Sequence, residues 1–331
     1  MKPYKILLLL SILAIFFGCQ KKEQLSKDIR LKGFVFGTTY NIVYLDSKEN
    51  FQKSIDSLFF LMNKSLSTYI PTSDISRINK GDSTVVVDHL FTEVFIKSKR
   101  IYRETNGYFD PTVGNLVNSW GFGPKNEKKN LTKEEVNEQM QSVGLDKVSL
   151  ENGKIIKHNP KIYLDFNSIA KGLGIDVIAR FLESKKTDNY LVEIGGEIRT
   201  KGFKKDSLPW IVKLVDPIKK DSNNGFKEIN LSNKSMATSG NYRKFRETKD
   251  GTKYVHTVNP KTGFAIESNL LSASVIANKD CADVDAYATA FMAMGLEKTK
   301  YFLKTNNNIK VILIFTNNRG DLEEFSTYTY K

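Results

Sequence analysis

Cysteine and histidine are scarce in this sequence. Its 331 residues include two cysteines, Cys19 and Cys281, and three histidines. If Cys19 carries a lipid, Cys281 has no partner, so the fold must be held by its own hydrophobic core and not by disulfides. About 300 residues are enough to build such a core. The same scarcity disfavours zinc, because zinc sites draw mainly on cysteine and histidine.

Long apolar runs are also missing, except at the N-terminus. Lys2 and Lys5 precede an apolar run over residues 6–17. This run is too short to span a bilayer as a mature helix and is typical of a signal-peptide core. A cytosolic chain with a buried N-terminal helix is the alternative, but the polar residues 20–27 would continue such a helix poorly.

The apolar run ends at Gly18-Cys19. This ending resembles a bacterial lipoprotein processing site, in which the cysteine becomes the lipidated first residue. We therefore expect a signal peptide over residues 1–18, a lipidated tether over residues 19–30 and a folded domain over residues 31–331. The expected location is the bacterial cell envelope, with the domain anchored to the membrane through Cys19 on the periplasmic side.

The charge balance is basic. The formal net charge of +13 becomes +11 without the leader, since the leader contributes Lys2 and Lys5 and no acidic residue. The lysines are scattered and no repeat interleaves aromatic with basic residues, which argues against nucleic acid as a partner. Anionic phospholipid headgroups or phosphorylated small molecules are the expected partners.

The mature chain is predicted to form one compact domain, because no internal repeat, low-complexity tract or long linker divides it. Helical apolar spacing predicts helices over residues 51–67, 91–105 and 281–294. Alternating or short apolar runs predict strands over residues 33–45, 190–194, 253–258, 271–277 and 311–315. The mixture predicts a fold of the α/β or α+β class.

Two local signals add detail. Thr132 followed by Glu135 is a capping box, which starts a helix that is expected to end near Gly144. Asn152-Gly153 predicts the turn of a hairpin over residues 148–156.

The segment His256-Thr257-Val258-Asn259-Pro260-Lys261-Thr262-Gly263 places one of the three histidines in a turn rich in hydroxyl groups. Asn259-Pro260 and Thr262-Gly263 interrupt the backbone, so the preceding strand should end here with the imidazole near solvent. Such a loop can hold a proton carrier beside a phosphate. A surface histidine followed by a turn is the alternative.

Residues 164–172, Leu-Asp-Phe-Asn-Ser-Ile-Ala-Lys-Gly, are predicted to pass from a short strand into a helix. Asp165, Asn167 and Ser168 are available as caps, and Lys171 is expected one turn into the helix. Free amides at a helix start favour an anion. A plain N-cap followed by a solvated lysine is the alternative.

Asp285 and Thr289 are four residues apart and therefore share one face of the helix predicted over residues 281–294. A carboxylate and a hydroxyl so placed are hard oxygen ligands, which suit magnesium with retained waters and substrate phosphate. Asp283 lies off that face. In the alternative, Asp285 belongs to the first turn, where the helix dipole favours it, and Thr289 packs inside.

Four loops place glycine beside polar or aromatic groups, at residues 36–40, 66–69, 105–113 and 193–197. Aromatic rings there can stack on a flat ligand ring, and glycine lets backbone approach a ligand closely. Tyrosine and phenylalanine in such numbers also serve simple cores.

Together these segments resemble the ApbE family of FAD:protein FMN transferases. The matching motifs, from about residue 36 to residue 295, are GTTY at Gly37, STY at Ser67, SDISRIN at Ser73, NGYFDPTV at Asn106, IAKG at Ile169, EIGGEIRTKG at Glu193, TSGNY at Thr238, HTVNPKTG at His256 and ATAFMAMG at Ala288.

The resemblance implies a magnesium-dependent enzyme that splits FAD and passes its FMN half to a Ser or Thr hydroxyl of an acceptor flavoprotein, forming a phosphoester and releasing AMP. It implies that Ser168, Asp285 and Thr289 bind Mg²⁺, with Ser168 acting through its backbone. His256 is implied as the general base, a role that suits an imidazole. FAD contacts are implied at Phe36, Tyr69, Tyr108, Phe109, Asp110, Asp165, Lys171 and Val258.

The chain departs from the family pattern at two places. Phe36 stands where the family commonly has Met, and Asn167-Ser168 stand where it commonly has Gly-Gly. Both changes bear on the flavin site and leave the expected metal ligands intact. Two other functions share most of these residues: an FAD pyrophosphatase that yields FMN and AMP, and a non-catalytic flavin-binding lipoprotein.

Overall fold

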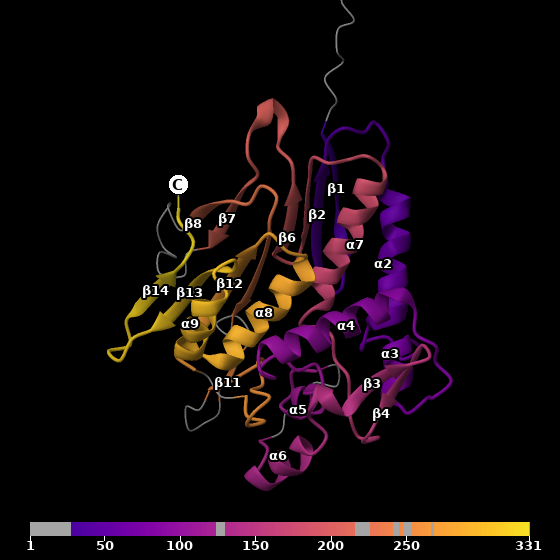
Figure 1. The fold of residues 1–331 in the computed structure, drawn as a ribbon, viewed down its shortest axis with the longest axis vertical. Coiled ribbons are helices and arrows are strands. Elements are labelled where there is room, and N and C mark those ends of the chain that lie inside the picture. The colour runs from indigo at the N-terminus through magenta and orange to yellow at the C-terminus, as the bar shows by residue number, and fades with distance from the viewer. Residues whose placement is uncertain are drawn as a thin grey trace, which may run out of the picture.

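A computed structural model describes residues 28–123, 130–215, 226–240, 245–247, 253–265 and 268–330. At its centre is an eight-stranded sheet in which every neighbouring pair is antiparallel (Figure 1). In spatial order its strands are β1 (Ile29–Val35), β2 (Thr38–Tyr44), β5 (Tyr190–Ile194), β6 (Glu197–Lys201), β9 (Ser235–Gly240), β12 (Leu270–Ala277), β13 (Lys310–Thr316) and β14 (Leu322–Ser326). The α+β architecture predicted from the sequence is confirmed.

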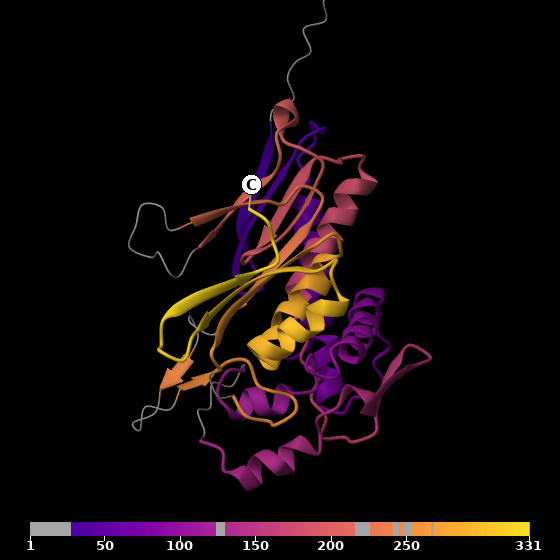
Figure 2. The same ribbon diagram turned by 60° about the vertical axis from the view of Figure 1, so that its left-hand side comes forward.

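Helices cover one face of this sheet (Figure 2). Helix α7 packs on β5 and β6, and α8 packs on β9 and β12; three further helices pack against these two. Their bounds are α2 (Gln52–Leu66), α4 (His89–Glu104), α7 (Ala170–Ser184), α8 (Cys281–Met294) and α9 (Leu296–Thr305). The main core lies between this helical layer and the sheet. Cys281 is buried in it and is a free thiol.

The opposite face of the sheet is partly covered by a two-stranded ribbon, β7 (Ile211–Val215) and β8 (Phe226–Asn230). Ile198 and Ile276 point to this side and pack with Val212 of the ribbon. Because β12 is therefore covered on both faces, its sequence is apolar with small residues and not alternating.

The remaining elements lie around one end of the sheet. They are α3 (Asp74–Asn79), α5 (Gly114–Ser119), α6 (Lys133–Met140), the hairpin β3 (Val148–Glu151) and β4 (Lys154–Lys157), and the pair β10 (Phe245–Glu247) and β11 (Lys253–Val255). A separate small core joins Trp120, Val136 and Val258. The indole Nε1 of Trp120 donates a hydrogen bond of 2.9 Å to the carbonyl of Gly263, which ties the loop after β11 to this region.

Local signals in the sequence located several elements well. The helix predicted over residues 281–294 is α8 with the same bounds, and the capping box of Thr132 and Glu135 starts α6. The hairpin turns at Asn152 and Gly153, both at positive φ, as a tight two-residue turn requires. Helix α6 ends at Met140, earlier than the predicted end near Gly144.

The strand predicted over residues 33–45 is wrong in one respect, because the segment is two strands. Phe36 and Gly37 both have positive φ, at 52° and 74°, and reverse the chain between β1 and β2. Phenylalanine is unusual in such a turn, and at residue 36 it continues the alternating apolar pattern of the two strands. The pattern therefore gave no sign that the chain reverses there. In addition, β1 begins at Ile29, two residues before the domain start predicted at 31.

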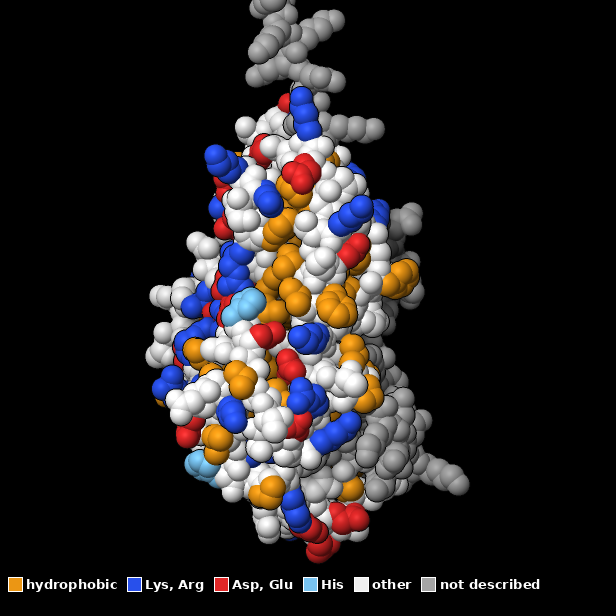
Figure 3. All heavy atoms as spheres, turned by 90° about the vertical axis from the view of Figure 1, so that its right-hand side faces the viewer, with side chains coloured by type: hydrophobic (Ala, Val, Ile, Leu, Met, Phe, Trp, Pro, Cys, Tyr) orange, Lys and Arg blue, Asp and Glu red, His pale blue; other side chains and the backbone are white. Residues whose placement is uncertain are grey.

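The surface of the molecule mixes charges and apolar groups. Figure 3 shows the side on which α2 lies in Figure 1, with a band of hydrophobic side chains among interspersed Lys, Arg, Asp and Glu. Phe60 and Leu61 of α2 are exposed. None of the described helices has both the length and the apolar character needed to cross a membrane. The predicted signal peptide and Cys19 lie outside the described residues.

Candidate active site

A large cavity of about 1320 Å³ opens where the loops of the sheet meet the N-terminus of α7 and one face of α8. This volume exceeds the roughly 300–1,000 Å³ of a pocket for a drug-sized ligand and suits a dinucleotide. All the site residues predicted within the described chain line it: Phe36, Tyr69, Tyr108, Phe109, Asp110, Asp165, Ser168, Lys171, His256, Val258, Asp285 and Thr289. Residues from six distant segments are thus brought to one place.

The most strongly charged part of the cavity lies between α7, α8 and β6. Asp285 is 4% exposed, and its Oδ2 accepts a hydrogen bond of 3.1 Å from the amide of Gly172. Lys171 Nζ lies 2.6 Å from Oε1 of Glu197, whereas Glu197 Oε2 is buried without a hydrogen-bond partner. The cluster therefore carries two carboxylates and one ammonium group.

The pKa values reflect this crowding. Burial and the nearby charge of Asp285 raise the pKa of Glu197 to about 7. Burial also raises the pKa of Asp285. Burial alone would lower the pKa of Lys171, but the carboxylates of Glu197 and Asp285 raise it. A further cation close to Asp285 would relieve the repulsion between the two carboxylates.

Hydroxyl groups line the cavity beside this cluster. Thr289 lies one turn beyond Asp285 on α8, as the spacing predicted, and its Oγ1 is 3.3 Å from Ser239 Oγ. Thr238 Oγ1 lies 2.8 Å from Ser274 Oγ on the neighbouring strand. Among the described residues no three His, Cys, Asp or Glu side chains are grouped to hold a metal ion. A metal here would depend on Asp285, hydroxyl and backbone oxygens, water and substrate phosphate, which is the coordination that Mg²⁺ accepts.

The start of α7 differs from the prediction. The N-cap is Ile169, which makes no side-chain capping bond, and Lys171 lies in the first turn and not one turn in. The strand expected before the helix is reduced to a single bridge between Tyr163 and Val113. Two of the side chains expected as caps, those of Asp165 and Asn167, instead make hydrogen bonds within the loops around the cavity.

Asp165 and Asn167 make these loop contacts. Asp165 Oδ1 accepts a hydrogen bond of 2.8 Å from the amide of Asn167, and the amide of Asp165 donates to the carbonyl of Pro111. Asn167 Nδ2 donates to Thr68 Oγ1 at 3.3 Å. Burial raises the pKa of Asp165. These contacts join the NGYFDPTV and STY loops to the start of the helix. Asn167, which stands where the family commonly has glycine, therefore contributes a side-chain hydrogen bond that glycine could not make.

His256 directly follows β11, which ends at Val255, so the strand predicted over residues 253–258 is three residues too long. The histidine is partly buried and lines the cavity. Its loop is held in shape by Asn259, whose carbonyl accepts from the amide of Gly263 at 2.8 Å. Asn259 Nδ2 also donates to the carbonyl of Ala293 near the end of α8. The loop of His256 is therefore attached to the helix that carries Asp285.

Two tyrosines are the aromatic side chains best placed for a flat ligand. Tyr69 is 62% exposed although it lines the cavity. Tyr108 accepts a hydrogen bond of 2.6 Å from Lys298, and Lys261 Nζ lies 5.8 Å from its ring centroid. Phe109, by contrast, is 1% exposed and belongs to the core.

Asp110 lines the cavity, but its carboxylate serves the surrounding loop. Its Oδ1 accepts from the amide and hydroxyl of Thr112, and its Oδ2 accepts from the amide of Leu145. Burial raises the pKa of Asp110 to about 6, against the effect of these hydrogen bonds.

Phe36 forms part of the cavity wall at the β1–β2 turn. Its ring contacts Phe59 edge to face, with centroids 5.7 Å apart. On α7 a Cβ added to Gly174 would lie 2.8 Å from Phe36 Cε2. The larger side chain that replaces the family methionine is accommodated by this glycine.

Glu197 is the main site residue that the sequence interpretation missed. It lies within the quoted motif EIGGEIRTKG, but nothing in the motif says which side of β6 faces the cavity. Arg199, two residues on, lies on the same face of the strand and binds Asp176 of α7, whereas Glu197 binds Lys171 of α7. Opposite charges at alternate positions of one strand were a signal for ion pairs with a neighbouring helix, although not for the cavity.

The antiparallel sheet, its helical layer and the cavity define an α+β protein with a large, partly polar cavity. The chain belongs to the ApbE family, whose family model matches residues 36–313. It is 36% identical over 334 residues to the FAD:protein FMN transferase of Vibrio cholerae, covering 98% of this chain and 97% of that protein.

Solved structures agree with this assignment. The flavin transferase ApbE from Vibrio cholerae matches with a TM-score of 0.80 at 34% identity, covering 91% of this chain and 97% of that one. The apo form of Pseudomonas stutzeri flavinyl transferase ApbE matches with a TM-score of 0.82 at 28% identity, covering 91% and 95%. The family predicted from the sequence motifs is confirmed.

Proposed function

We propose that this chain is a magnesium-dependent FAD:protein FMN transferase. It cleaves FAD, attaches FMN through a phosphoester bond to a Ser or Thr hydroxyl of an acceptor flavoprotein, and releases AMP. The observation that supports this most is the convergence of Lys171, Asp285, Thr289 and His256 in one dinucleotide-sized cavity. The relatives named as FAD:protein FMN transferases support the substrate.

The chemistry requires neutralised charge and precise positioning more than a covalent intermediate. Asp285 and Thr289, with a backbone oxygen near Ser168, would hold Mg²⁺, which supplies positive charge against the pyrophosphate when bound. Lys171 is held by Glu197 at the start of α7 and would add positive charge against the same phosphates. The tyrosines 69 and 108 offer rings for stacking on the flat parts of FAD.

His256 is proposed to take the proton from the acceptor hydroxyl. Its loop is attached through Asn259 to Ala293 of α8, the helix that also carries Asp285. A general base contributes roughly 10²–10⁴-fold to a rate. A flavin-binding protein without catalysis would have no use for this base or for two repelling carboxylates, which favours an enzyme.

The replacement His256→Ala tests this assignment, with His158→Ala, outside the cavity, as the matched control. We expect His256→Ala to lower FMN transfer by roughly 10²–10⁴-fold while FAD affinity changes little. Flavin titration and acceptor mass are measured on the same preparations. Transfer at the wild-type rate across pH 6 to 9 would contradict the base role, and lost FAD affinity with residual transfer would make His256 a binding residue.

We further propose that the protein is a lipoprotein of the bacterial cell envelope, anchored through Cys19 with its catalytic domain on the periplasmic side. The leader sequence supports this, and the short tether ends where β1 begins at Ile29. The acceptor would then be an exported or membrane flavoprotein.

A further inference from the structure

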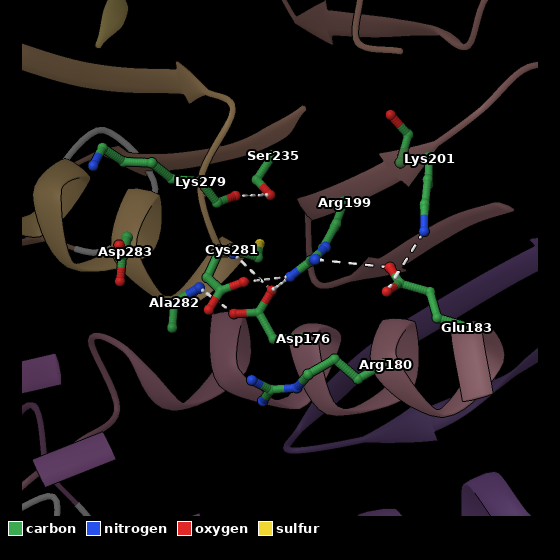
Figure 4. A network of polar contacts seen from close by, with 12 residues as sticks. Asp176, Arg180, Glu183, Arg199, Lys201, Ser235, Lys279, Cys281, Ala282 and Asp283 are labelled. Carbon is green, nitrogen blue, oxygen red and sulfur yellow. Dashed lines mark hydrogen bonds and ion pairs between the residues drawn. The ribbon is translucent and has the colours of Figure 1, made fainter. Parts of the chain in front are cut away.

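Helices α7 and α8 hold each other through a reciprocal exchange of hydrogen bonds. Asp176 of α7 is fully buried, and its two oxygens accept from the amides of Cys281 and Ala282 at the start of α8, at 2.8 and 2.9 Å (Figure 4). In return, Asp285 of α8 accepts from the amide of Gly172 at the start of α7. We refer to this pair of contacts as the clasp.

The clasp leaves little room for adjustment. A Cβ on Gly172 would lie 2.5 Å from the carbonyl oxygen of Cys281 and 2.6 Å from the amide nitrogen of Ala282. The two helices therefore meet backbone to backbone at this point. On α7 the bonded amide of Gly172 and the carboxylate of Asp176 are four residues apart, and on α8 the amide of Cys281 and the carboxylate of Asp285 are also four apart. A shift of either helix along its axis would therefore break both sets of hydrogen bonds.

A second layer of charges supports the Asp176 half. Arg199 of β6 lies 2.5 Å from Asp176 and 2.6 Å from Asp280. Asp280 is the N-cap residue of α8 but makes no capping bond of its own, because it binds Arg199 and Lys97 instead. Asp176 thus replaces it as the cap of α8. Burial and the neighbouring Asp280 raise the pKa of Asp176 to about 6.

Charged residues of β6, α7 and α8 meet at two places, and the net interaction is repulsive at one and attractive at the other. In the cavity, β6, α7 and α8 contribute Glu197, Lys171 and Asp285, a set with an excess negative charge in which two carboxylates repel. Behind it, the same elements contribute Arg199, Asp176 and the cap of α8, where the contacts are attractive. The attractive layer opposes the separation that the cavity charges favour.

We propose that Asp176 is a positioning residue for the metal site. It fixes the start of α8 against α7, and so places the Asp285 carboxylate at the amide of Gly172 and near Lys171. Asp176 does not line the cavity and touches no ligand itself. The inference rests on the proposed function, since it assigns the positioned carboxylate to Mg²⁺.

The test compares Asp176→Asn with Asp283→Asn in the full-length protein. Asp283 is the matched control. Like Asp176 it is a buried carboxylate, but it lies on α8 and binds Arg100 and Lys97 of α4. Both variants are expected to lose stability. Binding of Mn²⁺ in the presence of FAD is measured by calorimetry, and hydrogen exchange of the Gly172 amide reports its bond to Asp285.

For Asp176→Asn we expect Mn²⁺ affinity to fall roughly 10-fold or more, as for other residues that orient a metal ligand, and the Gly172 amide to lose protection. For Asp283→Asn both should stay at the wild-type level. Wild-type Mn²⁺ affinity and protection in Asp176→Asn would overturn the proposal. If Asp176→Asn does not fold, Asp176→Glu takes its place with the same expected direction, because it keeps the negative charge beside Arg199 but moves the carboxylate away from the amides of Cys281 and Ala282.

Failure of the proposed metal site would look different. The wild-type protein would then bind no Mn²⁺ with FAD. The exchange of the Gly172 amide in the Asp176 variant would still decide whether the clasp places Asp285.

Discussion

Asp283 and Asp285 lie two residues apart on α8, are both buried, and are expected to give opposite phenotypes when each is changed to asparagine. Asp285 faces the cavity and has one hydrogen-bond donor, the Gly172 amide. Asp283 faces α4 and pairs with Arg100 at 2.6 Å and Lys97 at 3.5 Å. One carboxylate is thus assigned to the reaction and the other to the fold.

The magnitudes follow from these contacts. Asparagine at 285 keeps an oxygen for Gly172 and removes one of two repelling charges, so the free energy of unfolding should change by less than about 1 kcal/mol. Asparagine at 283 removes one carboxylate from Arg100 and Lys97, which keep Glu104 and Asp280 as their remaining partners. A fully buried pair would lose about 3–5 kcal/mol, and because Arg100 is 33% exposed we expect about 1–3 kcal/mol.

Activity should show the reverse order. Disturbing a residue that supports a metal ligand costs roughly 10–100-fold, so loss of the proposed ligand Asp285 should exceed that range. Asp283→Asn should retain most of the FAD cleavage rate. AMP release from FAD with saturating Mg²⁺ measures activity, and urea unfolding without metal measures stability. FAD cleavage at the wild-type rate by Asp285→Asn would refute the reasoning, as would equal losses of stability in the two variants.

Three further predictions concern charge, pH and location. Lys171→Gln should weaken FAD binding and lower the melting temperature by leaving two buried carboxylates without their cation, and added Mg²⁺ should recover part of the stability; a melting temperature indifferent to Mg²⁺ would contradict this. The pKa of Asp110 is about 6 in the folded chain, above its unfolded value, so its contribution to stability is complete below about pH 4 and is lost as pH rises through 6. Asp110→Asn should therefore flatten this part of the dependence of unfolding free energy on pH, by at most about 3 kcal/mol for a pKa difference of about two; an unchanged slope between pH 4 and 7 counts against it. Cys19→Ser should abolish labelling by a fatty-acid analogue and release the chain from the membrane, while FAD cleavage by the solubilised protein persists; unchanged labelling would exclude the proposed anchor.

Elements with a strong local signal could be predicted from the sequence. Helix α8 follows from its apolar spacing, α6 from its capping box and the β3–β4 hairpin from Asn152-Gly153. In each case the residues that decide the structure lie within one or two turns of each other. The turn at Phe36 lacked such a signal, because phenylalanine carries no preference for the left-handed conformation that it adopts there.

The cavity residues were predictable as a set because the family motifs cover nearly the whole domain. Their partners were not. The side chain of Asp110 was expected at a ligand and is committed to Thr112 and Leu145, and the clasp joins Asp176 to amides 105 and 106 residues away. Such pairings depend on how α7 and α8 cross, which no local pattern in a single sequence specifies.

The central claim is that this cavity transfers FMN to a protein hydroxyl. The most direct measurement is the intact mass of an exported acceptor flavoprotein after incubation with this protein and FAD, with and without Mg²⁺. The account predicts that the acceptor gains one FMN phosphoester per site only when Mg²⁺ is present, with one AMP released for each FMN attached, and that an acceptor whose Ser or Thr is replaced by Ala gains nothing. FAD split to free FMN and AMP with no gain in acceptor mass would contradict it and identify a pyrophosphatase.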